Sequence, residues 1–314
     1  MYDVVIIGAG PAGLSAAIYA KRAGLNAVTI EKNSMSGGQV LNTYEVDNYP
    51  GLYGINGFDM GMKFREHADK LECEFKTGTV VNIKADQMEN VGEHGFLIET
   101  DEEAIYARTV VAAMGAMHAK LNIPGEEELL GRGVSYCATC DGAFFRGKTT
   151  AVIGGGDVAA EDAIFLARKC KKVYLLHRRD ELRAARILQD KVKALPNVEI
   201  LWNTVVKTVE GQDHVEGLQI EDVQTGESKK IDVDGVFIAV GIIPDSSILK
   251  GVADCDEKGY VIADEDCVCS TPGIFAAGDV RTKKLRQIVT AAADGANAIH
   301  SVQEYLLHCG GVEK

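Results

Sequence analysis

The chain has 314 residues, of which 46% are hydrophobic and 25% charged, a composition typical of a globular protein of about two domains. Its formal net charge of −13 argues against nucleic-acid binding, because the sequence contains no basic patch large enough to offset it. No apolar run approaches the roughly 20 residues of a membrane-spanning helix, and no secretory signal precedes the first predicted strand. Most of the eight cysteines are scattered, which favours a reducing, cytoplasmic location.

A first nucleotide-binding motif is predicted at the start of the chain. The apolar run over residues 2–8 predicts a buried strand and residues 14–23 predict a helix, with a glycine-rich turn between them. This turn has the pattern GxGxxG and comprises Gly8, Gly10, Pro11, Ala12 and Gly13. Its first glycine permits the tight turn, its second lets the backbone approach a pyrophosphate, and its third lets the helix pack closely. Glu31 follows 18 residues later at the end of the next predicted strand, where a carboxylate accepts hydrogen bonds from a ribose.

A polar loop follows this motif. Two readings remain open for it: a surface loop, or a loop laid along a nucleotide-like ligand with Gln39 and Asn48 as neutral donors and acceptors. Further along we predict a helix over 58–71 and strands over 75–83 and 95–107 in a small sheet of their own. Residues 109–115 predict another buried strand.

A second nucleotide-binding motif repeats the first. The strand predicted over 149–153 leads into the pattern GxGxxA, which includes Gly154, Gly156 and Asp157, and then into a helix over 160–169. At the spacing that places an acid in the first motif, this one has a basic cluster of His177, Arg178, Arg179 and Arg183. Arginines at this position accommodate a 2′-phosphate through charge-assisted hydrogen bonds. The alternative is a solvated helix start.

The repeated βαβ pattern predicts an α/β fold built from two related nucleotide-binding domains. A further apolar strand ends at Gly278-Asp279, which would place a carboxylate at the carboxyl end of a sheet strand, where such folds bind ligands. Arg286 and Gln287 precede a long predicted helix that begins at Ile288, and its N-terminus could face the ligand.

The segment Cys137-Ala138-Thr139-Cys140-Asp141 lies between the two motifs. Its two thiols could form a redox-active disulfide that accepts electrons from a nicotinamide, or hold a metal. Zinc needs four ligands, and apart from Cys267 and Cys269 no second pair stands at a suitable spacing, so we predict no metal. Cys267 and Cys269 would share one face of an extended strand as small, buried or half-buried side chains.

These motifs, in this order and spacing, resemble those of the low-molecular-weight thioredoxin reductases over essentially the whole chain. The resemblance implies FAD at the first motif and NADPH at the second. It also implies two Rossmann-like three-layer domains, one inserted in the other: an FAD-binding domain of residues 1–115 and 243–314, and an NADPH-binding domain of residues 116–242 that carries the cysteine pair. The two short chain crossings between these domains would act as a hinge for rotation.

The resemblance further implies that Cys140 faces the flavin and Cys137 attacks the partner's disulfide, which makes Asp141 the candidate acid. The predicted partner is thioredoxin or a thioredoxin-like protein, and the enzyme is expected to be a homodimer. A related flavoprotein that reduces a peroxiredoxin or another disulfide carrier remains the alternative. The predicted cofactor-binding residues are Gly8, Gly10, Pro11, Ala12, Gly13, Glu31, Lys32, Gly37, Gly38, Gln39, Asn48, Gly115, Gly154, Gly156, Asp157, His177, Arg178, Arg179, Arg183, Gly278, Asp279, Arg286, Gln287 and Ile288.

Overall fold

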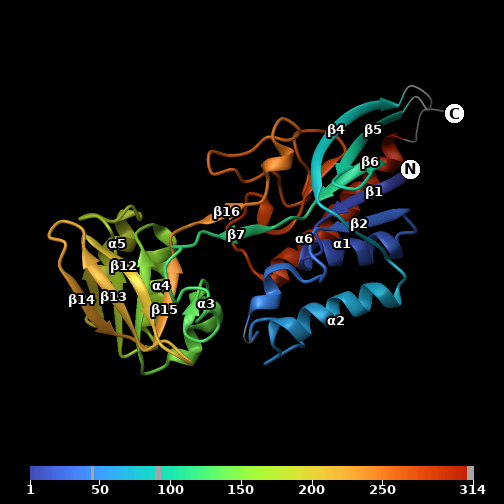
Figure 1. Cartoon of the computed structure of the whole chain (residues 1–314). Helices are drawn as coiled ribbons and strands as arrows, with labels where there is room; N and C mark the ends of the chain where they lie inside the picture. Colours follow the sequence, from blue (N-terminus) through green and yellow to red (C-terminus); the bar gives the residue numbers. More distant parts are fainter. Residues whose placement is uncertain (44–45, 89–92, 310–314) are drawn as a thin grey trace. The chain divides into compact units, whose positions relative to one another are not determined.

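The computed structural model in Figure 1 describes residues 1–43, 46–88 and 93–309. The chain divides into two compact units. Unit 1 comprises Met1–Met117 and Ile243–Lys314, and unit 2 comprises His118–Ile242. Among the helices in the described ranges, none is long and apolar enough to cross a membrane.

Unit 1 is organised around a seven-stranded sheet with the order β3-β2-β1-β6-β5-β4, in which β17 pairs with β6. Its strands are β1 (Tyr2–Ile7), β2 (Ala27–Glu31), β3 (Glu74–Thr77), β4 (Val80–Met88), β5 (Glu93–Thr100), β6 (Ala104–Ala112) and β17 (Ile274–Ala276). The pairs β3–β2, β2–β1, β1–β6 and β6–β17 are parallel. The pairs β6–β5 and β5–β4 are antiparallel. The carboxyl ends of the parallel strands therefore meet at one edge of the sheet.

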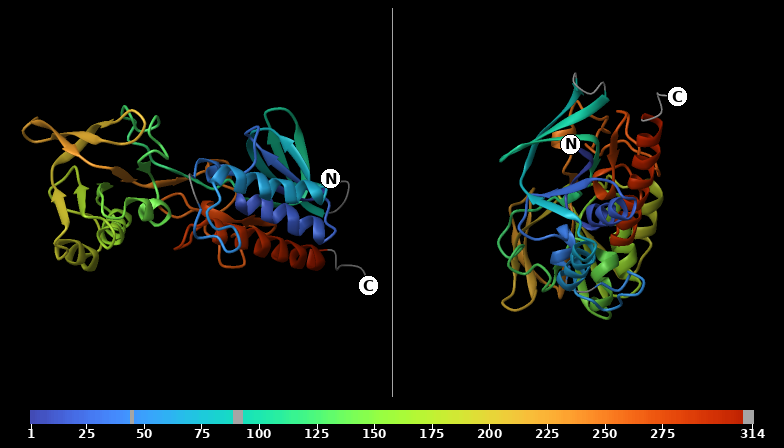
Figure 2. Two further views of the ribbon diagram at one scale, coloured as in Figure 1. Left: turned by 90° about the horizontal axis from the view of Figure 1, so that it is seen from below. Right: turned by 90° about the vertical axis from the view of Figure 1, so that its right-hand side faces the viewer.

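Two layers cover this sheet. The helices α2 (Gly57–Lys70), α1 (Pro11–Arg22) and α6 (Ile288–Cys309) lie side by side, with α1 between the other two (Figure 2). Val4 and Ile6 of β1 pack with α1 and α6 in one apolar cluster. Val5 and Ile7 pack with β4, β5 and residues of the segment 249–280 in another. This alternation along β1 is what a strand buried on both faces requires.

Unit 2 repeats this architecture around a five-stranded parallel sheet with the order β11-β10-β9-β15-β8. Its strands are β8 (Val134–Ser135), β9 (Thr149–Gly154), β10 (Lys172–Leu176), β11 (Val198–Leu201) and β15 (Gly235–Ala239). Val152 of β9 packs with the helices α4 (Asp157–Ala167) and α5 (Arg186–Lys193). Ala151 and Ile153 pack instead with an antiparallel sheet of β12 (Thr204–Glu210), β13 (Gly217–Asp222) and β14 (Ser228–Asp232).

The remaining elements are short. The strands β7 (Ala116–His118) and β16 (Ile242–Pro244) pair with each other where the chain passes between the units. The helix α3 (Ala138–Asp141) contains one turn. The described residues also include the 3₁₀ turns η1 (Gly38–Asn42), η2 (Gly142–Phe145), η3 (Ser247–Leu249) and η4 (Gly278–Val280).

The α/β fold with parallel sheets is as predicted, but the separate small sheet is wrong. The predicted strand over 75–83 is two strands, β3 and β4. Both belong to the main sheet of unit 1. The bounds predicted for the strands over 95–107 and 109–115 are also wrong, because β5 ends at Thr100 and the continuous strand β6 runs from Ala104 to Ala112 across the predicted break. Ala107 shows why: it pairs with Tyr2 of β1 on one side and with Phe96 of β5 on the other, so one strand serves both neighbours.

Candidate functional site

The cysteine pair lies in unit 2, directly after the edge strand β8. Cys137 and Cys140 form a disulfide, with their Cα atoms 5.3 Å apart. Cys137 is the N-cap of α3, and its sulfur accepts the backbone N–H of Cys140 at 3.2 Å. The hydroxyl of Thr139 lies 3.4 Å from the same sulfur. After reduction, these two donors would stabilise a thiolate on Cys137, because hydrogen bonds to a charged form favour that form.

Asp141 lies next to the disulfide and is half-buried. Its Oδ1 is buried and has no hydrogen-bond partner among the residues that the structure describes. Burial raises the pKa of Asp141, and a hydrogen bond from Ser135 partly offsets this increase. The Ser135 hydroxyl also accepts the backbone N–H of Cys137 at 3.0 Å. Asp141 is thus a carboxyl group that takes up a proton more readily than an exposed one, placed beside two sulfurs.

Three side chains near the disulfide escaped the sequence prediction. Glu126 is 1% exposed, accepts three backbone N–H groups of the preceding turn at 2.9, 2.7 and 3.4 Å, and accepts the hydroxyl of Tyr136 at 2.8 Å. The ring of His118 stacks on Tyr136, with the centroids 5.0 Å apart. This cluster fixes the residue that precedes Cys137. The cluster carries no local sequence signal, because Glu126 stands in a run of three acids that is typical of a solvent-exposed segment.

The glycine-rich turn of unit 1 joins β1 to α1, as predicted. Gly8 has a φ of +100°, and a Cβ there would lie 2.6 Å from the carbonyl oxygen of Ala113. A Cβ on Gly13 would lie 1.8 Å from the carbonyl oxygen of Gly8, so this glycine permits the close approach of helix and strand. A Cβ on Gly10 would meet no atom within 4 Å. The turn therefore leaves open space at its second glycine, where a pyrophosphate approaches the backbone.

The other predicted residues of the first half gather around this turn. Glu31, at the end of β2, accepts the backbone N–H of Ala9 at 2.6 Å. The N–H of Gly37 donates to the carbonyl oxygen of Ala9 at 2.7 Å. A Cβ on Gly38 would lie 3.2 Å from the Cα of Gly10, and Gln39 follows in η1. The polar loop thus lies beside the glycine-rich turn.

A second group of predicted residues comes from η4 and the start of α6. A Cβ on Gly278 would lie 2.9 Å from the Cβ of Ala12, which places η4 beside the same turn. The Oδ1 of Asp279 and the Nε of Arg286 are buried and have no partner within the described part of the chain. Burial raises the pKa of Asp279, although nearby Lys283 and Arg286 lower it in opposition. A ligand with hydroxyl groups would satisfy both atoms.

The remaining predicted cofactor-binding residues of unit 1 lie at the margin of the residues described so far. The side-chain amide of Asn48 donates to the Oε1 of Gln287 at 2.8 Å. Lys32 forms an ion pair with Asp245 at 2.7 Å, and the backbone N–H of Asp245 donates to the carbonyl oxygen of Gly115 at 3.0 Å. Ile288, the first residue of α6, packs on a small apolar cluster that includes Met60. The predicted residues of unit 1 are thus brought together near the carboxyl ends of β1, β2 and β17.

The glycine-rich turn of unit 2 joins β9 to α4 in the same way. A Cβ on Gly154 would lie 2.4 Å from the carbonyl oxygen of Ala239, whereas one on Gly156 would meet no atom within 4 Å. The ring of His177 covers Gly155, since a Cβ there would lie 2.1 Å from a ring carbon. Burial lowers the pKa of His177, and Arg183 and Arg179 lower it further through their charge. Its buried Nε2 has no partner in the described structure.

The predicted basic cluster follows β10. Arg178, Arg179 and Arg183 are exposed, and none of their guanidinium groups has a hydrogen-bond or ion-pair partner among the described residues. The backbone N–H of Arg183 donates to the carbonyl oxygen of Gly155 at 2.7 Å, so the cluster borders the glycine-rich turn. Asp157, at the first turn of α4, uses its Oδ1 to accept the backbone N–H of Ala185 at 2.7 Å. These contacts leave three cations free beside an open turn.

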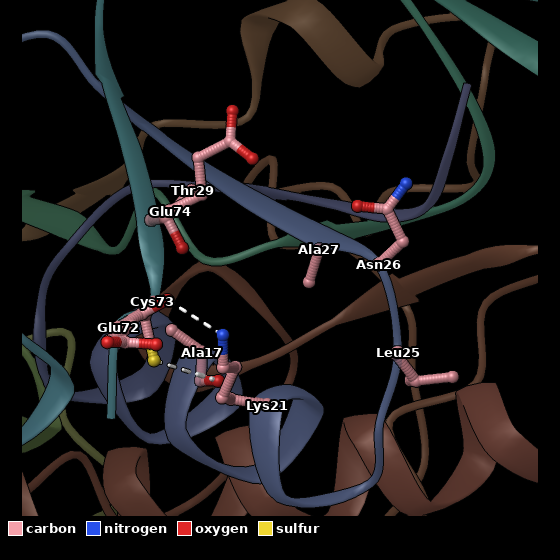
Figure 3. A pocket seen from close by; sticks show the side chains of 9 residues that line it. All are labelled: Ala17, Lys21, Leu25, Asn26, Ala27, Thr29, Glu72, Cys73 and Glu74. Atoms are coloured by element: carbon pink, nitrogen blue, oxygen red, sulfur yellow. Dashed lines mark hydrogen bonds between the residues drawn. The ribbon is translucent and has the colours of Figure 1, made fainter.

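A pocket of about 120 Å³ lies elsewhere in unit 1 (Figure 3). Its lining residues are Ala17, Lys21, Leu25, Asn26, Ala27, Thr29, Glu72, Cys73 and Glu74. They come from α1, from the amino-terminal part of β2 and from the start of β3, whereas ligands of open α/β sheets bind at the carboxyl ends. The pocket is also smaller than the roughly 300 Å³ of small-molecule sites. It is therefore separate from the residues described above.

Cys267 and Cys269 are buried, as predicted, but the condition for a shared strand face, an extended backbone, is not met. Cys267 has a φ of +64°, which is not extended backbone. The turn sends the two side chains into different apolar clusters on opposite faces of the sheet. Burial raises the pKa of both thiols to about 12. Within the described ranges, no three His, Cys, Asp or Glu side chains are placed to hold a metal ion.

Comparisons with known proteins agree with this arrangement. The sequence signature of the pyridine nucleotide-disulphide oxidoreductases matches residues 2–295. A thioredoxin reductase of Bacillus subtilis is 44% identical over 98% of this chain and 95% of its own length. One of Treponema pallidum is 42% identical over 97% of each chain. The crystal structure of thioredoxin reductase from Streptococcus pyogenes matches with a TM-score of 0.91 at 45% identity, covering 98% of this chain and 99% of that one.

The family match spans both glycine-rich turns and the disulfide between them. The relatives named above match at 42–45% identity over nearly their whole lengths. The chain belongs to the pyridine nucleotide-disulphide oxidoreductases, and among them to the thioredoxin reductases, a family of FAD-binding, NADPH-dependent enzymes.

Proposed function

We propose that this enzyme passes electrons from NADPH through FAD to the disulfide of Cys137 and Cys140, and from there to the disulfide of a thioredoxin. The observation that carries the proposal is this disulfide, which closes at the carboxyl end of the edge strand β8 in a chain with two nucleotide-type turns. When bound, NADPH supplies a hydride and FAD relays its two electrons.

We assign FAD to unit 1. Three observations support this assignment: the open space at Gly10, the acid Glu31 at the ribose position, and the unpaired buried Oδ1 of Asp279. A ribityl chain and a pyrophosphate carry the acceptors and hydroxyl groups that these positions lack. The predicted set from Gly8 to Asn48, with Gly115 and the residues from Gly278 to Ile288, would form this site.

We assign NADPH to unit 2. Gly154 and Gly156 would form the pyrophosphate turn, with Asp157 directly after it at the start of α4, and Arg178, Arg179 and Arg183 would hold the 2′-phosphate. The unpaired guanidinium groups support this, because Arg binds phosphate through two parallel hydrogen bonds. His177 is held neutral by burial, so its unpaired Nε2 can accept or donate a single hydrogen bond to the cofactor.

The residues of the redox turn would divide the thiol chemistry as follows. The Cys137 thiolate attacks one sulfur of the partner's disulfide, which forms a mixed disulfide and releases the partner's other sulfur as a thiolate. Cys140 then attacks Cys137, which restores the intramolecular disulfide and releases the partner as a dithiol. The two electrons leave with the partner. Asp141 holds the proton that passes between the sulfurs and solvent.

Four further assignments rest on this function. The partner is a thioredoxin, which follows from the names of the relatives. A peroxiredoxin or another disulfide carrier is the second candidate, because the Cys137 turn presents the same nucleophile to any accessible disulfide. We also propose that the enzyme is a homodimer and that it works in the cytoplasm, where the cysteines outside the redox pair would stay reduced.

The test measures NADPH oxidation by the FAD-loaded enzyme with a thioredoxin disulfide, a peroxiredoxin disulfide or neither. We expect turnover with thioredoxin that is lost in Cys137→Ser and Cys140→Ser. Cys137→Ser alone should show the long-wavelength absorbance of a thiolate beside oxidised flavin, because Cys140 is assigned to the flavin side. The same absorbance in Cys140→Ser would reverse the two roles. Turnover that survives loss of both sulfurs would refute the disulfide mechanism.

A further inference from the structure

The segment of residues 178–185 carries the three arginines of the basic cluster, and several hydrogen bonds hold its backbone, among them one from the N–H of Asn203 to the carbonyl oxygen of Arg179 at 3.1 Å. The N–H of Arg183 donates to the carbonyl oxygen of Gly155 at 2.7 Å. The N–H of Ala185 donates to the Oδ1 of Asp157 at 2.7 Å. The side-chain amide of Gln189 donates to the carbonyl oxygens of Leu182 and Ala184, at 3.1 and 2.9 Å. The last two contacts come from side chains and can be removed by substitution.

Apart from these two hydrogen bonds, the position of Gln189 in the fold does not favour a polar side chain. It is 8% exposed and lies in α5, where the neighbouring Val192 is fully buried. An apolar residue would fill this position at less cost, because a buried amide must find partners for both of its N–H groups. Gln189 finds them in the two carbonyl groups on either side of Arg183. Its amide therefore fixes the backbone from which Arg183 projects.

Asp157 acts on the same segment from the other side. It is exposed and stands in the first turn of α4, beside the turn proposed for the pyrophosphate. A carboxylate there would repel a phosphate, so direct contact with the cofactor is an unfavourable use of its charge. Its Oδ1 instead accepts the N–H of Ala185. This contact ties the end of the arginine segment to the glycine-rich turn.

These contacts matter for nucleotide selectivity because the arginines are exposed. A long, flexible side chain loses conformational freedom when it is immobilised on a ligand, and a backbone that is already fixed limits this entropic cost to the side chain itself. NADH lacks the 2′-phosphate, so it gains nothing from the placement of the arginines. Loosening the segment should therefore weaken NADPH binding and leave NADH binding unchanged.

We propose that Gln189 and Asp157 are positioning residues that set the preference of this site for 2′-phosphorylated nucleotides. The inference deepens the proposed function and rests on it, because it takes unit 2 as the NADPH site. Neither residue needs to contact the cofactor. Each acts through the backbone of the arginine segment.

The first test is Gln189→Met, which keeps the length of the side chain and removes both N–H donors. We expect KM for NADPH to rise about five- to tenfold, as two lost hydrogen bonds allow, while kcat and the KM for NADH stay unchanged. Calorimetry on the FAD-loaded enzyme should show the same loss for adenosine 2′,5′-bisphosphate and none for 5′-AMP. The matched control is Gln219→Met, since the Gln219 amide donates to Glu210 in the neighbouring β-layer, and it should leave both affinities unchanged.

Asp157 provides a second test that does not disturb the core. Asp157→Ala removes the acceptor and should lower the ratio of NADPH to NADH affinity, whereas Asp157→Asn keeps an acceptor oxygen and should preserve that ratio. Equal loss for both nucleotides in Gln189→Met, or an unchanged ratio in Asp157→Ala, would overturn the inference.

A third pair of variants separates this inference from the proposed function. Replacing Arg178 and Arg179 by Ala should abolish the preference for NADPH. If it does so while Gln189→Met leaves the preference intact, the site assignment holds and the positioning role is refuted. If the arginine variants have no effect, the assignment of NADPH to unit 2 is itself refuted.

Discussion

Asp141 illustrates how burial prepares one side chain for proton transfer. A carboxylate in an apolar setting is poorly solvated, so its protonated form gains relative to its charged form and its pKa rises. At near-neutral pH, the charge on Asp141 lowers the free energy of unfolding, whereas a neutral side chain would not. Ser135 limits this cost through its hydrogen bond. The same environment that makes Asp141 useful therefore makes it destabilising.

Asp141→Asn should make the protein more stable and less active. Between the unfolded pKa of 3.8 and the raised folded pKa, the native state binds more protons than the unfolded state, so the unfolding free energy falls as pH rises. Above this window the whole penalty is present. We therefore expect Asp141→Asn to raise Tm at pH 7 and to leave it nearly unchanged below about pH 3.8, while thioredoxin reduction slows.

The control for this measurement is Asp213→Asn, which changes an exposed acid in a loop of unit 2. It should shift Tm little at either pH. A Tm at pH 7 that is lower for Asp141→Asn than for the wild type would contradict the argument from burial.

At the scale of elements, each of the two glycine-rich turns contains one glycine that the packing of the protein requires and another that leaves room for a ligand. Gly13 and Gly154 face carbonyl oxygens of their own unit at less than 2.5 Å from a virtual Cβ. Gly10 and Gly156 face open space and have a backbone that any residue can adopt, with φ of −74° and −94°. The first kind permits the fold, and the second leaves room for a pyrophosphate.

Alanine substitution in the second turn should separate these two roles. Gly154→Ala should cost about 1–3 kcal/mol of unfolding free energy, because the added methyl group overpacks the contact with Ala239. Gly156→Ala should change the unfolding free energy by only about 1 kcal/mol or less, yet raise KM for NADPH about tenfold by filling the cofactor's space. Thermal unfolding and cofactor titration of both variants check this. A Gly156→Ala enzyme with a normal KM would show that no ligand approaches the turn there.

The elements that the sequence predicted well are those with a local signature. The glycine-rich turns, their flanking strands and helices, and the cysteine pair follow from spacing along the chain. Gln189 and Glu126 could not be predicted, because burial of a polar side chain depends on which distant backbone groups reach it. The small sheet was mispredicted for a related reason, since Ala107 acquires its two partner strands only in the folded unit.

At the scale of the whole molecule, the chain passes between units 1 and 2 twice, and both passages lie in one short ribbon. β7 and β16 pair with each other, and the N–H of Ala119 donates to the carbonyl oxygen of Gly241 at 2.9 Å. Gly241 has a φ of +137°, which side chains rarely adopt. The proposed reaction needs both NADPH and the Cys137–Cys140 disulfide to reach one flavin in turn. We therefore predict that the ribbon is the hinge of a rotation between two states.

Gly241→Ala tests this hinge. Alanine is strained at this φ by about 1–3 kcal/mol, so it should shift the balance between the two states and slow steady-state thioredoxin reduction. Reduction of the flavin in a single turnover should still occur. Gly147→Ala is the control, because Gly147 also has a positive φ, of +74°, and open space around it, but lies in a turn within unit 2. If both variants lose stability and neither slows turnover, the ribbon is not the hinge.

The same ribbon bears on how such a chain could have been assembled. The first residues of unit 2 and its last residues lie on adjacent, hydrogen-bonded strands, so the gap that its removal would leave in unit 1 is only the distance between two paired strands. A linker of a few residues could close that gap, and conversely a gene segment encoding a guest domain could enter a host at this point without breaking the host's sheet. A chain of unit 1 alone, the unit to which we assign the flavin, with a simple turn in place of residues 118–242, is therefore a physically reasonable ancestor.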